Sequence, residues 1–351
     1  MLFSRKIEPV ALDIGSSFIK LVQLKGSKGA YQLVKFGMVP LPPEVIVEGA
    51  VMDAGRVVDA IKELLASQNV KTKEVVISVS GSSVIIKRIA VSDATEEELA
   101  ESIKWEAEQY IPFSIDDVNV DFQKLGRAGA AEGQADILLV AVKKDKINDY
   151  INLVKEAGLE PVVMDVDAFA LANMYELNYE MSAGITALLN IGASVMNISI
   201  LKDGVSIFTR DITVGGNRYT EALQKECGLS YEDAERVKQG EAVEGADAGN
   251  AAAVMSSVTE DIVGETQRSF DFFRSTTGSD SVARVLVSGG CARIKNFTNA
   301  LSERIGIPVE ITNPFKNVKV DPKRFNPAAL QEAGPQCAVA VGLAIRRPGD
   351  R

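Results

Sequence analysis

The hydrophobic positions from Val10 to Gly26 predict a β-hairpin near the start of the chain. An apolar run leads to Asp13, a turn follows at Gly15-Ser16-Ser17, and Phe18 to Leu24 is rich in strand-forming residues. Such a turn can direct backbone N–H groups and two hydroxyls at one point, and its glycine lets an anion approach the main chain. Many hairpins that bind nothing carry the same turn, so this stretch alone assigns no function.

A second copy of the hairpin, from Leu188 to Gly204, changes this interpretation. When the two stretches are aligned, the turn glycines Gly15 and Gly192 coincide, as do hydrophobic residues on both sides of them. The second turn reads Gly192-Ala193-Ser194. The pattern therefore predicts two similar halves, and two turns that face each other can hold both ends of a polyphosphate, which one turn cannot.

The pattern around the hairpins predicts an α/β protein with a block inserted in its first half. A helix capped by Asp53 and a buried strand at Val75 to Val79 complete the first domain. In the block, a capping box of Thr95 and Glu98 begins a helix that runs to Tyr110, and the expected order is β-α-β-β-α. We expect a first subdomain of residues 1-82, 163-182 and 335-351, an inserted subdomain of 83-162, a second subdomain of 183-215 and 275-334, and a helical subdomain of 216-274.

Two glycine pairs mark further places where the backbone can approach a ligand closely. One is in Gly215-Gly216-Asn217, and the other is Gly289-Gly290, which follows a buried strand. Between them, Glu235 and Lys238 are one helical turn apart, which fits an ordinary surface ion pair as well as a pair of ligand contacts. A long helix is expected from about Val254, after an acidic loop.

Composition narrows the chemistry. The chain has no histidine, which excludes His-based triads and almost every zinc site. A net charge of -10 argues against nucleic acid and against attachment to anionic lipid. The cysteines are odd in number and far apart, no apolar run has the length of a membrane span, and the N-terminus shows no signal-peptide core. We therefore expect a cytoplasmic protein whose partners are proteins or a nucleotide neutralised by Mg²⁺.

Two phosphate-type hairpins, a crossover helix from Asp167, a strand before Gly289-Gly290 and a small-residue final helix together resemble the actin, Hsp70 and sugar-kinase superfamily. The resemblance implies duplicated actin-like (ribonuclease H-like) α/β domains that bind ATP and Mg²⁺. Asp13 would bind the metal through water. The residues implied at the phosphates and nucleoside are Asp13, Gly15, Ser16, Ser17, Lys20, Asn190, Gly192, Ala193, Ser194, Gly215, Gly216, Asn217, Glu235, Lys238, Gly289, Gly290 and Arg293.

Within the superfamily, the inserted block is similar to the displaced subdomain of the cell-division protein FtsA. Tyr-Ile-Pro-Phe at Tyr110, Asp-Val-Asp-Ala-Phe-Ala-Leu-Ala-Asn at Asp165 and Arg-Ser-Phe-Asp-Phe-Phe at Arg268 resemble the PilM family, the actin-like proteins of the type IV pilus machine. This resemblance implies an ATP-binding scaffold for pilus assembly and twitching motility, held at the inner membrane by the cytoplasmic N-terminal peptide of PilN and other platform proteins. Related secretion and competence systems carry similar proteins, so the machine stays open, as does self-association.

Position 190 is Asn where hydrolysing relatives usually place Asp, which predicts slow or absent ATP hydrolysis. Asp165 and Asp167 are candidates for orienting an attacking water, and a helix cap is the alternative for at least one of them. A small-molecule kinase of the sugar-kinase branch and an FtsA-like cell-division protein are the alternative functions. Measuring ATP consumption with and without sugars would separate a kinase from a scaffold.

A groove for the PilN peptide is expected at the seam between the first domain and the inserted subdomain. We place it near the helix from Thr95 to Tyr110 and the turn that follows. The candidate contacts are Trp105, Tyr110, Ile111 and Phe113. On spacing alone, Trp105 and Phe113 are more often core residues.

Overall fold

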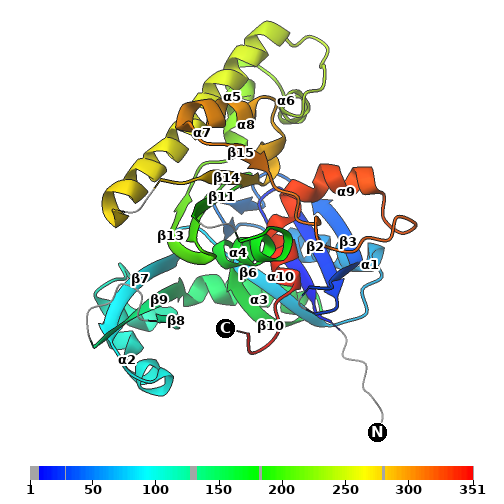
Figure 1. The fold of residues 1–351 in the computed structure, drawn as a ribbon. Coiled ribbons are helices and arrows are strands. Elements are labelled where there is room, and N and C mark those ends of the chain that lie inside the picture. Colours follow the sequence, from blue (N-terminus) through cyan, green and yellow to red (C-terminus); the bar gives the residue numbers. More distant parts are fainter. Residues whose placement is uncertain (1–7, 28, 127–132, 182–183, 279–280, 351) are drawn as a thin grey trace.

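Two five-stranded sheets, each built around one of the predicted hairpins, form the centre of the molecule (Figure 1). The computed structural model describes residues 8–27, 29–126, 133–181, 184–278 and 281–350. The first seven residues, on which part of the signal-peptide expectation rests, lie outside these ranges.

The first sheet has the order β10-β6-β1-β2-β3. Its strands are β1 (Val10–Ile14), β2 (Phe18–Lys25), β3 (Gln32–Pro40), β6 (Glu74–Val79) and β10 (Glu160–Val166). The hairpin strand β1 pairs antiparallel with β2 and parallel with β6. A small hairpin of β4 (Ile46–Val47) and β5 (Ala50–Val51) lies outside the sheet.

The second sheet repeats this arrangement, with the order β13-β12-β11-β14-β15. Its strands are β11 (Ile185–Ile191), β12 (Met196–Lys202), β13 (Val205–Ile212), β14 (Arg284–Ser288) and β15 (Val309–Ile311). Here β11 pairs antiparallel with β12 and parallel with β14, as β1 does with β2 and β6. The predicted duplication is therefore present in the topology as well as in the sequence.

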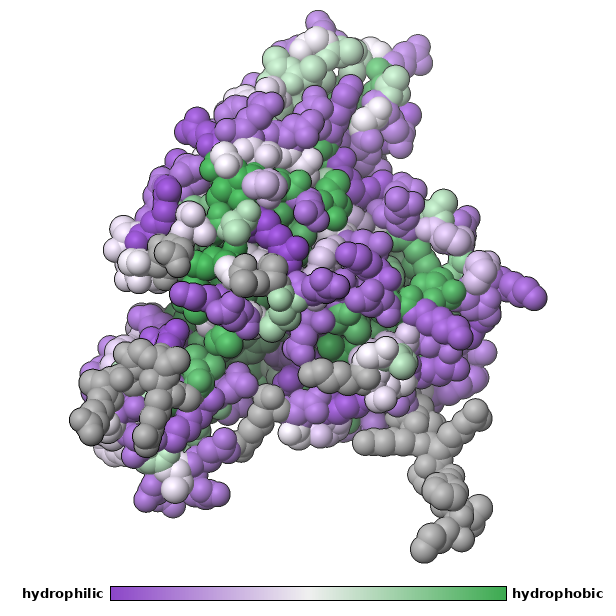
Figure 2. Space-filling view, viewed as in Figure 1, coloured by the Kyte–Doolittle hydropathy of each residue, from purple (hydrophilic) through white to green (hydrophobic). Residues whose placement is uncertain are grey.

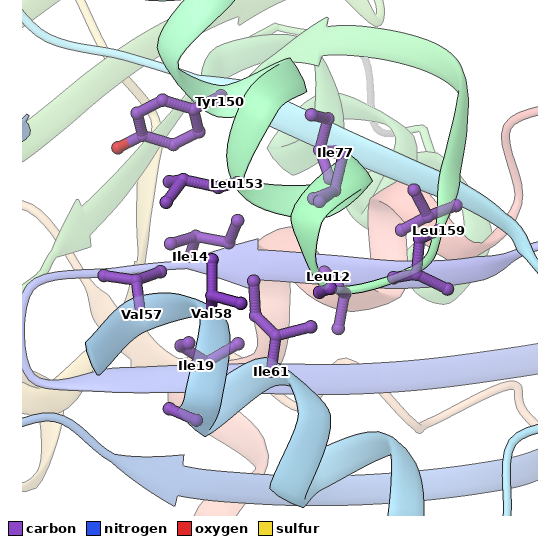
Figure 3. Close-up of a cluster of buried hydrophobic side chains, with 14 of the residues drawn as sticks. Leu12, Ile14, Ile19, Val57, Val58, Ile61, Ile77, Tyr150, Leu153 and Leu159 are labelled. Atoms are coloured by element: carbon purple, nitrogen blue, oxygen red, sulfur yellow. The ribbon is translucent and has the colours of Figure 1, made fainter. Parts of the chain in front are cut away.

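Helices α1 (Ala54–Ser67) and α3 (Lys144–Glu156) cover the outer face of the first sheet. Figure 3 shows the contact: Val57, Val58 and Ile61 of α1 point toward strand residues, and Tyr150 and Leu153 of α3 lie beside them. The side chains of β1 alternate, which sends every second one toward these helices and the others toward the middle of the molecule.

Helices α4 (Asp167–Asn178) and α10 (Ala338–Ala344) lie between the two sheets (Figure 1). One core cluster contains Ala11 of the first sheet, Leu188 of the second and the small residues of α10. At Gly342 the two helices touch so closely that a Cβ there would lie 1.7 Å from the carbonyl oxygen of Ala170. The final helix thus needs small residues because it fills a narrow space.

The outer face of the second sheet is covered by α5 (Asn217–Cys227), α7 (Ala248–Thr277) and α8 (Phe297–Ile305), with α6 (Tyr231–Lys238) packed on α5 and α7. The long helix begins at Ala248, earlier than expected, because Asp247 caps it by accepting hydrogen bonds from the N–H groups of Gly249 and Asn250. A short α9 (Pro327–Ala333) precedes α10.

The inserted block forms its own three-stranded sheet of β7 (Val84–Ser92), β8 (Val118–Gly126) and β9 (Gln134–Lys143), in the order β7-β9-β8. Helix α2 (Glu96–Glu108) begins at the predicted Thr95 and Glu98 capping box and packs on this sheet. The last helix of the expected block, α3, lies instead on the first sheet, because its apolar face meets the β1 and β6 side chains. Within the described ranges, no helix has the length and apolar character needed to cross a membrane.

Candidate functional site

A cavity of about 210 Å³ lies between the two halves, with the turn of each hairpin on its wall. Most of the residues predicted to hold a nucleotide line it. They are Asp13, Gly15, Ser16, Ser17, Lys20, Asn190, Gly192, Ala193, Ser194, Gly216, Glu235, Lys238, Gly289, Gly290 and Arg293. Gly215, Asn217 and the water-orienting candidate Asp165 are not on its wall, whereas Asp167 is.

The first turn brings two opposite charges together at the cavity. Lys20 is opposite Asp13 in the β1–β2 register, and its Nζ lies 3.1 Å from Asp13 Oδ2. Burial raises the pKa of Asp13, the Lys20 ammonium opposes that rise, and the charge of Asp167 adds to it. Asp13 and Asp167 would therefore gain from a nearby cation, and one or two carboxylates beside phosphate oxygens are the ligand set that suits Mg²⁺.

The second turn is supported from behind by the segment that follows β13. Gly216 N–H donates to the carbonyl of Gly192 at 2.9 Å, and Asn217 N–H donates to that of Ala193 at 2.8 Å. A Cβ on Gly215 would lie 2.5 Å from the Gly192 carbonyl oxygen, so no larger residue fits at this position. Gly215 and Asn217 thus shape the second turn from outside the cavity.

A chain of side-chain hydrogen bonds runs from the cavity wall along the second sheet. Ser288 Oγ donates to Asn190 Oδ1 at 3.3 Å, and Asn190 Nδ2 donates to Asn197 Oδ1 at 3.0 Å. Asn197 Nδ2 then donates to Asp211 Oδ1 at 2.8 Å, and Asp211 Oδ2 accepts from Gly81 N–H at 2.6 Å. The amide of Asn190 is therefore fixed in orientation and is part of a directional chain.

The far end of the cavity is built by α6 and by the turn after β14. Lys238 Nζ bonds Glu235 Oε1, and it lies 2.9 Å from Thr220 Oγ1. Gly289 has φ +85, and a Cβ there would lie 2.3 Å from the Ile191 carbonyl oxygen, so only glycine fits. Beside it, Gly290 has open space around its α-carbon, which leaves the cavity wall free for a ligand.

Comparison with known proteins decides the family. The sequence profile of the family described as type IV pilus assembly protein PilM matches residues 11–348. This chain belongs to the PilM family. The structure in the PilM-PilN type IV pilus biogenesis complex is 31% identical, with a TM-score of 0.85 over 97% of this chain and 100% of that one.

More distant relatives share the actin-like fold. The cell division protein FtsA of Bacillus subtilis (strain 168) is 24% identical over 257 residues, which is 66% of this chain and only 57% of FtsA. MreB 5 of Spiroplasma citri, in a structure bound to AMPPNP, is 14% identical with a TM-score of 0.52, over 97% of this chain and 96% of that one. The fold expected for this PilM-family protein, duplicated actin-like domains, is confirmed.

The two acidic candidates of the PilM-family chain have different surroundings. Asp165 is buried, and its Oδ2 lies 3.0 Å from Arg346 Nε, an ion pair without hydrogen-bond alignment. Burial raises the pKa of Asp165, and the Arg346 charge opposes that rise. Asp167 accepts a hydrogen bond from Ser78 Oγ at 2.6 Å and faces the cavity. The helix-cap alternative is wrong for both, because α4 is preceded by Val166 and has no side-chain cap.

Lys146 and Tyr150 of α3 are among the residues of the cavity wall that sequence reasoning missed. They are four positions apart and so share one face of the helix, but nothing local shows that this face turns toward the first hairpin. Burial raises the pKa of Tyr150, and the charges of Asp167 and Asp13 raise it further. Burial lowers the pKa of Lys146, and the negative charges of Asp167 and Asp149 oppose this decrease.

The seam between the first domain and the inserted sheet carries a groove of about 290 Å³, seen in Figure 2 as an indentation where β13 approaches β7. Its walls are Val79 to Ser82, Val84 to Lys87, Val166 to Ala168 and Thr209 to Asp211. The four candidate contacts do not line it. Their helix and turn contact β8, and the helix also shares a core cluster with Ile89 and Val91 of β7, whereas the groove is lined by Val84 to Lys87 of that strand.

The four candidate contacts differ from one another in exposure. Trp105 is 79% exposed on the outer face of α2, so the core alternative is wrong for it. Ile111 is buried, and Tyr110 and Phe113 are half-buried, with the Lys143 ammonium 4.3 Å from the centroid of the Phe113 ring. The inward face of α2 consists of Leu99, Ile103 and Ala107, which leaves Trp105 pointing away from the inserted sheet.

Proposed function

We propose that this PilM-family protein binds Mg-ATP in the cavity between its halves and that the bound nucleotide sets the geometry of the seam groove, which holds the cytoplasmic N-terminal peptide of PilN. The observation that carries the nucleotide assignment is the convergence on one cavity of two duplicated turns and Gly289-Gly290, where the backbone leaves room for phosphates and a nucleoside.

The residues divide the work by their position on the cavity wall. Asp13 and Asp167 would hold Mg²⁺, whose charge neutralises the outer phosphates. The two turns would donate backbone N–H groups and serine hydroxyls to the phosphates from opposite sides. Glu235 and Lys238, which are already bonded to each other, would contact the ribose and base. Because Asn190 is an amide engaged by its neighbours, it can take no proton from water, and slow hydrolysis follows.

Titration calorimetry tests the nucleotide assignment. Replacing Asp13 or Lys20 by Ala should weaken Mg-ATP binding by about 1.5 to 3 kcal/mol, the range for charge-assisted contacts. Lys25→Ala is the matched control, because Lys25 lies on the same strand as Lys20 but is exposed and away from the cavity. Equal affinity for ATP in the wild type and in both cavity variants would overturn the assignment.

Two observations support PilN as the partner. One is the PilM-PilN complex, in which a PilM relative is paired with PilN, and the other is the edge of β7 at the seam. Among the described strands, β7 pairs only with β9, so its other edge has no ladder partner and its main chain could bond to an extended peptide between β7 and the nearby β13. The seam joins the first domain, the inserted sheet and β13 of the second half, so a change in the angle between the halves would alter it. We propose that the protein reaches the inner membrane through this partner.

A labelled synthetic PilN peptide distinguishes binding in the seam groove from binding at α2, near which the sequence predicts the contacts. Ser82 is exposed on the groove wall, so Ser82→Trp should fill the groove and lower the affinity for the peptide by about tenfold. Trp105→Ala should leave this affinity nearly unchanged. The opposite result, measured by fluorescence anisotropy, would place the peptide on α2.

A further inference from the structure

The cationic side chains of the cavity wall are of two kinds. Lys20, Lys146, Lys238 and Arg293 line the cavity. Three of them are paired with carboxylates, as Lys20–Asp13, Lys238–Glu235 and Arg293–Glu332. For Lys146, no carboxylate among the described residues is close enough to form an ion pair. Of these four cations of the cavity wall, Lys146 is therefore the one without an ion-pair partner among the described residues.

The partners of the Lys146 ammonium are neutral. It bonds the carbonyl oxygen of Gly49, lies 3.4 Å from the Tyr150 hydroxyl and stands over the Tyr150 ring at 4.4 Å from its centroid. In the bond to the Gly49 carbonyl only the donor is charged, whereas in a bond to a phosphate oxygen both partners are charged, which adds the attraction of opposite charges. An anion within reach would therefore compete well with the Gly49 carbonyl.

The position of Lys146 fixes which end of a nucleotide it could meet. The charge of Asp167, the first residue of α4, acts on both Lys146 and Tyr150, and the charge of Asp13 in the first hairpin also acts on Tyr150, so these groups lie at one end of the cavity that they line. The groups expected at the nucleoside, Glu235 and Lys238, belong to α6 of the other half. Lys146 is therefore at the phosphate end of the cavity, on the side of the expected metal.

Lys146 also lies at a structural junction. Strand β9 is the central strand of the inserted sheet, and it ends at Lys143, directly before the first residue of α3. Gly49, whose carbonyl accepts the hydrogen bond from Lys146, is in the turn between β4 and β5 and has φ +81. A shift of the ammonium from this carbonyl to a ligand would release the β4–β5 turn and alter the first turn of the helix that continues the inserted sheet.

Building on the nucleotide binding proposed above, we propose that Lys146 distinguishes ATP from ADP: it leaves the Gly49 carbonyl to bind the terminal phosphate of ATP, and thereby couples that phosphate to the β4–β5 turn and to the inserted sheet. With ADP bound, the contact to Gly49 persists.

The first test compares affinities for a non-hydrolysable ATP analogue and for ADP, both with Mg²⁺, by titration calorimetry. Lys146→Gln should lose about tenfold or more in affinity for the ATP analogue and about twofold or less for ADP. Lys146→Arg should keep most of the preference for ATP because it keeps the charge. Lys155→Gln is the matched control, an exposed lysine in the last turn of the same helix.

The second test measures amide hydrogen exchange in the β4–β5 turn and at the junction of β9 with α3. Exchange should differ between the ATP-analogue and ADP states of the wild type, and this difference should vanish in Lys146→Gln. An unchanged ATP preference in that variant, an equal loss for both nucleotides, or an unchanged exchange difference would each overturn the inference. A wild-type protein that bound neither nucleotide would refute the proposed function itself, so the two failures are distinguishable.

Discussion

Replacing Asn190 by Asp should destabilise this protein. The amide of Asn190 donates to Asn197 Oδ1, and Asn197 in turn donates to Asp211. A carboxylate at position 190 has no proton to donate, so two acceptors would face each other. If Asn197 reversed its amide to serve the new carboxylate, its oxygen would face Asp211 instead.

One hydrogen bond is lost in either arrangement, and one acceptor is left against another in a mostly buried place. The cost of leaving a buried polar group unsatisfied is about 1–3 kcal/mol, and we expect the free energy of unfolding to fall by that amount near pH 8. The new carboxyl would have a raised pKa in the folded state, since burial already raises the pKa of Asp211 beside it. Its penalty is present above that pKa and fades as the pH falls toward about 5, because the protonated form can donate.

Urea unfolding at the two pH values measures the effect, and a double variant tests its cause. Asn190→Asp combined with Asp211→Asn reverses the two hydrogen bonds of Asn197, which can then donate to position 190 and accept from position 211. The oxygen of the new amide still accepts from Gly81 N–H. The double variant should be more stable than Asn190→Asp alone. Equal or lower stability would refute the reasoning, as would an Asn190→Asp variant as stable as the wild type.

Four further predictions concern two buried contacts, the exposed tryptophan and turnover. Gly342→Ala should lower the free energy of unfolding by about 1–3 kcal/mol, since its Cβ would overlap the Ala170 carbonyl and the gain in helix propensity is only about 1 kcal/mol; wild-type stability in urea unfolding would contradict this. Arg346→Gln should lower the free energy of unfolding by about 3 kcal/mol, because it leaves Asp165 unpaired. The loss should be larger near pH 8 than near pH 5, because the raised pKa of Asp165 lets its carboxyl take a proton as the pH falls. A loss that is independent of pH would contradict this prediction. Trp105→Ala should change the free energy of unfolding by less than about 0.5 kcal/mol, because this side chain is largely exposed. Wild-type ATP turnover should lie below about 1 per second in a phosphate-release assay, and a faster rate would refute the account of Asn190.

Much of the fold could be predicted because its signals are local. The apolar run of β1, the strand-forming residues of β2, the turn between them and the capping box at Thr95 are each recognised from a few neighbouring residues, and the second hairpin repeats the first. The cavity followed from this duplication, because two similar halves place their turns alike.

What could not be predicted depends on packing between distant segments. Spacing cannot show that α3 lies on the first sheet and turns Lys146 toward the cavity, nor that Asp165 finds its partner in Arg346 near the end of the chain. The exposure of Trp105 follows from which face of α2 meets the inserted sheet, and Leu99, rather than the larger aromatic residue, belongs to that face.

The close crossing of α4 and α10 between the sheets has a mechanical consequence. Backbone contact at Gly342 and Ala170 leaves no slack for one helix to slide along the other, so the crossing favours rotation of the halves about a nearly fixed pivot. The cavity walls reach close to this pivot through β1 and β11, whereas the inserted sheet and the tip of α7 lie far from it (Figure 1). Displacement grows with distance from a pivot, so a small rotation at the cavity would become a larger movement at these two extremities.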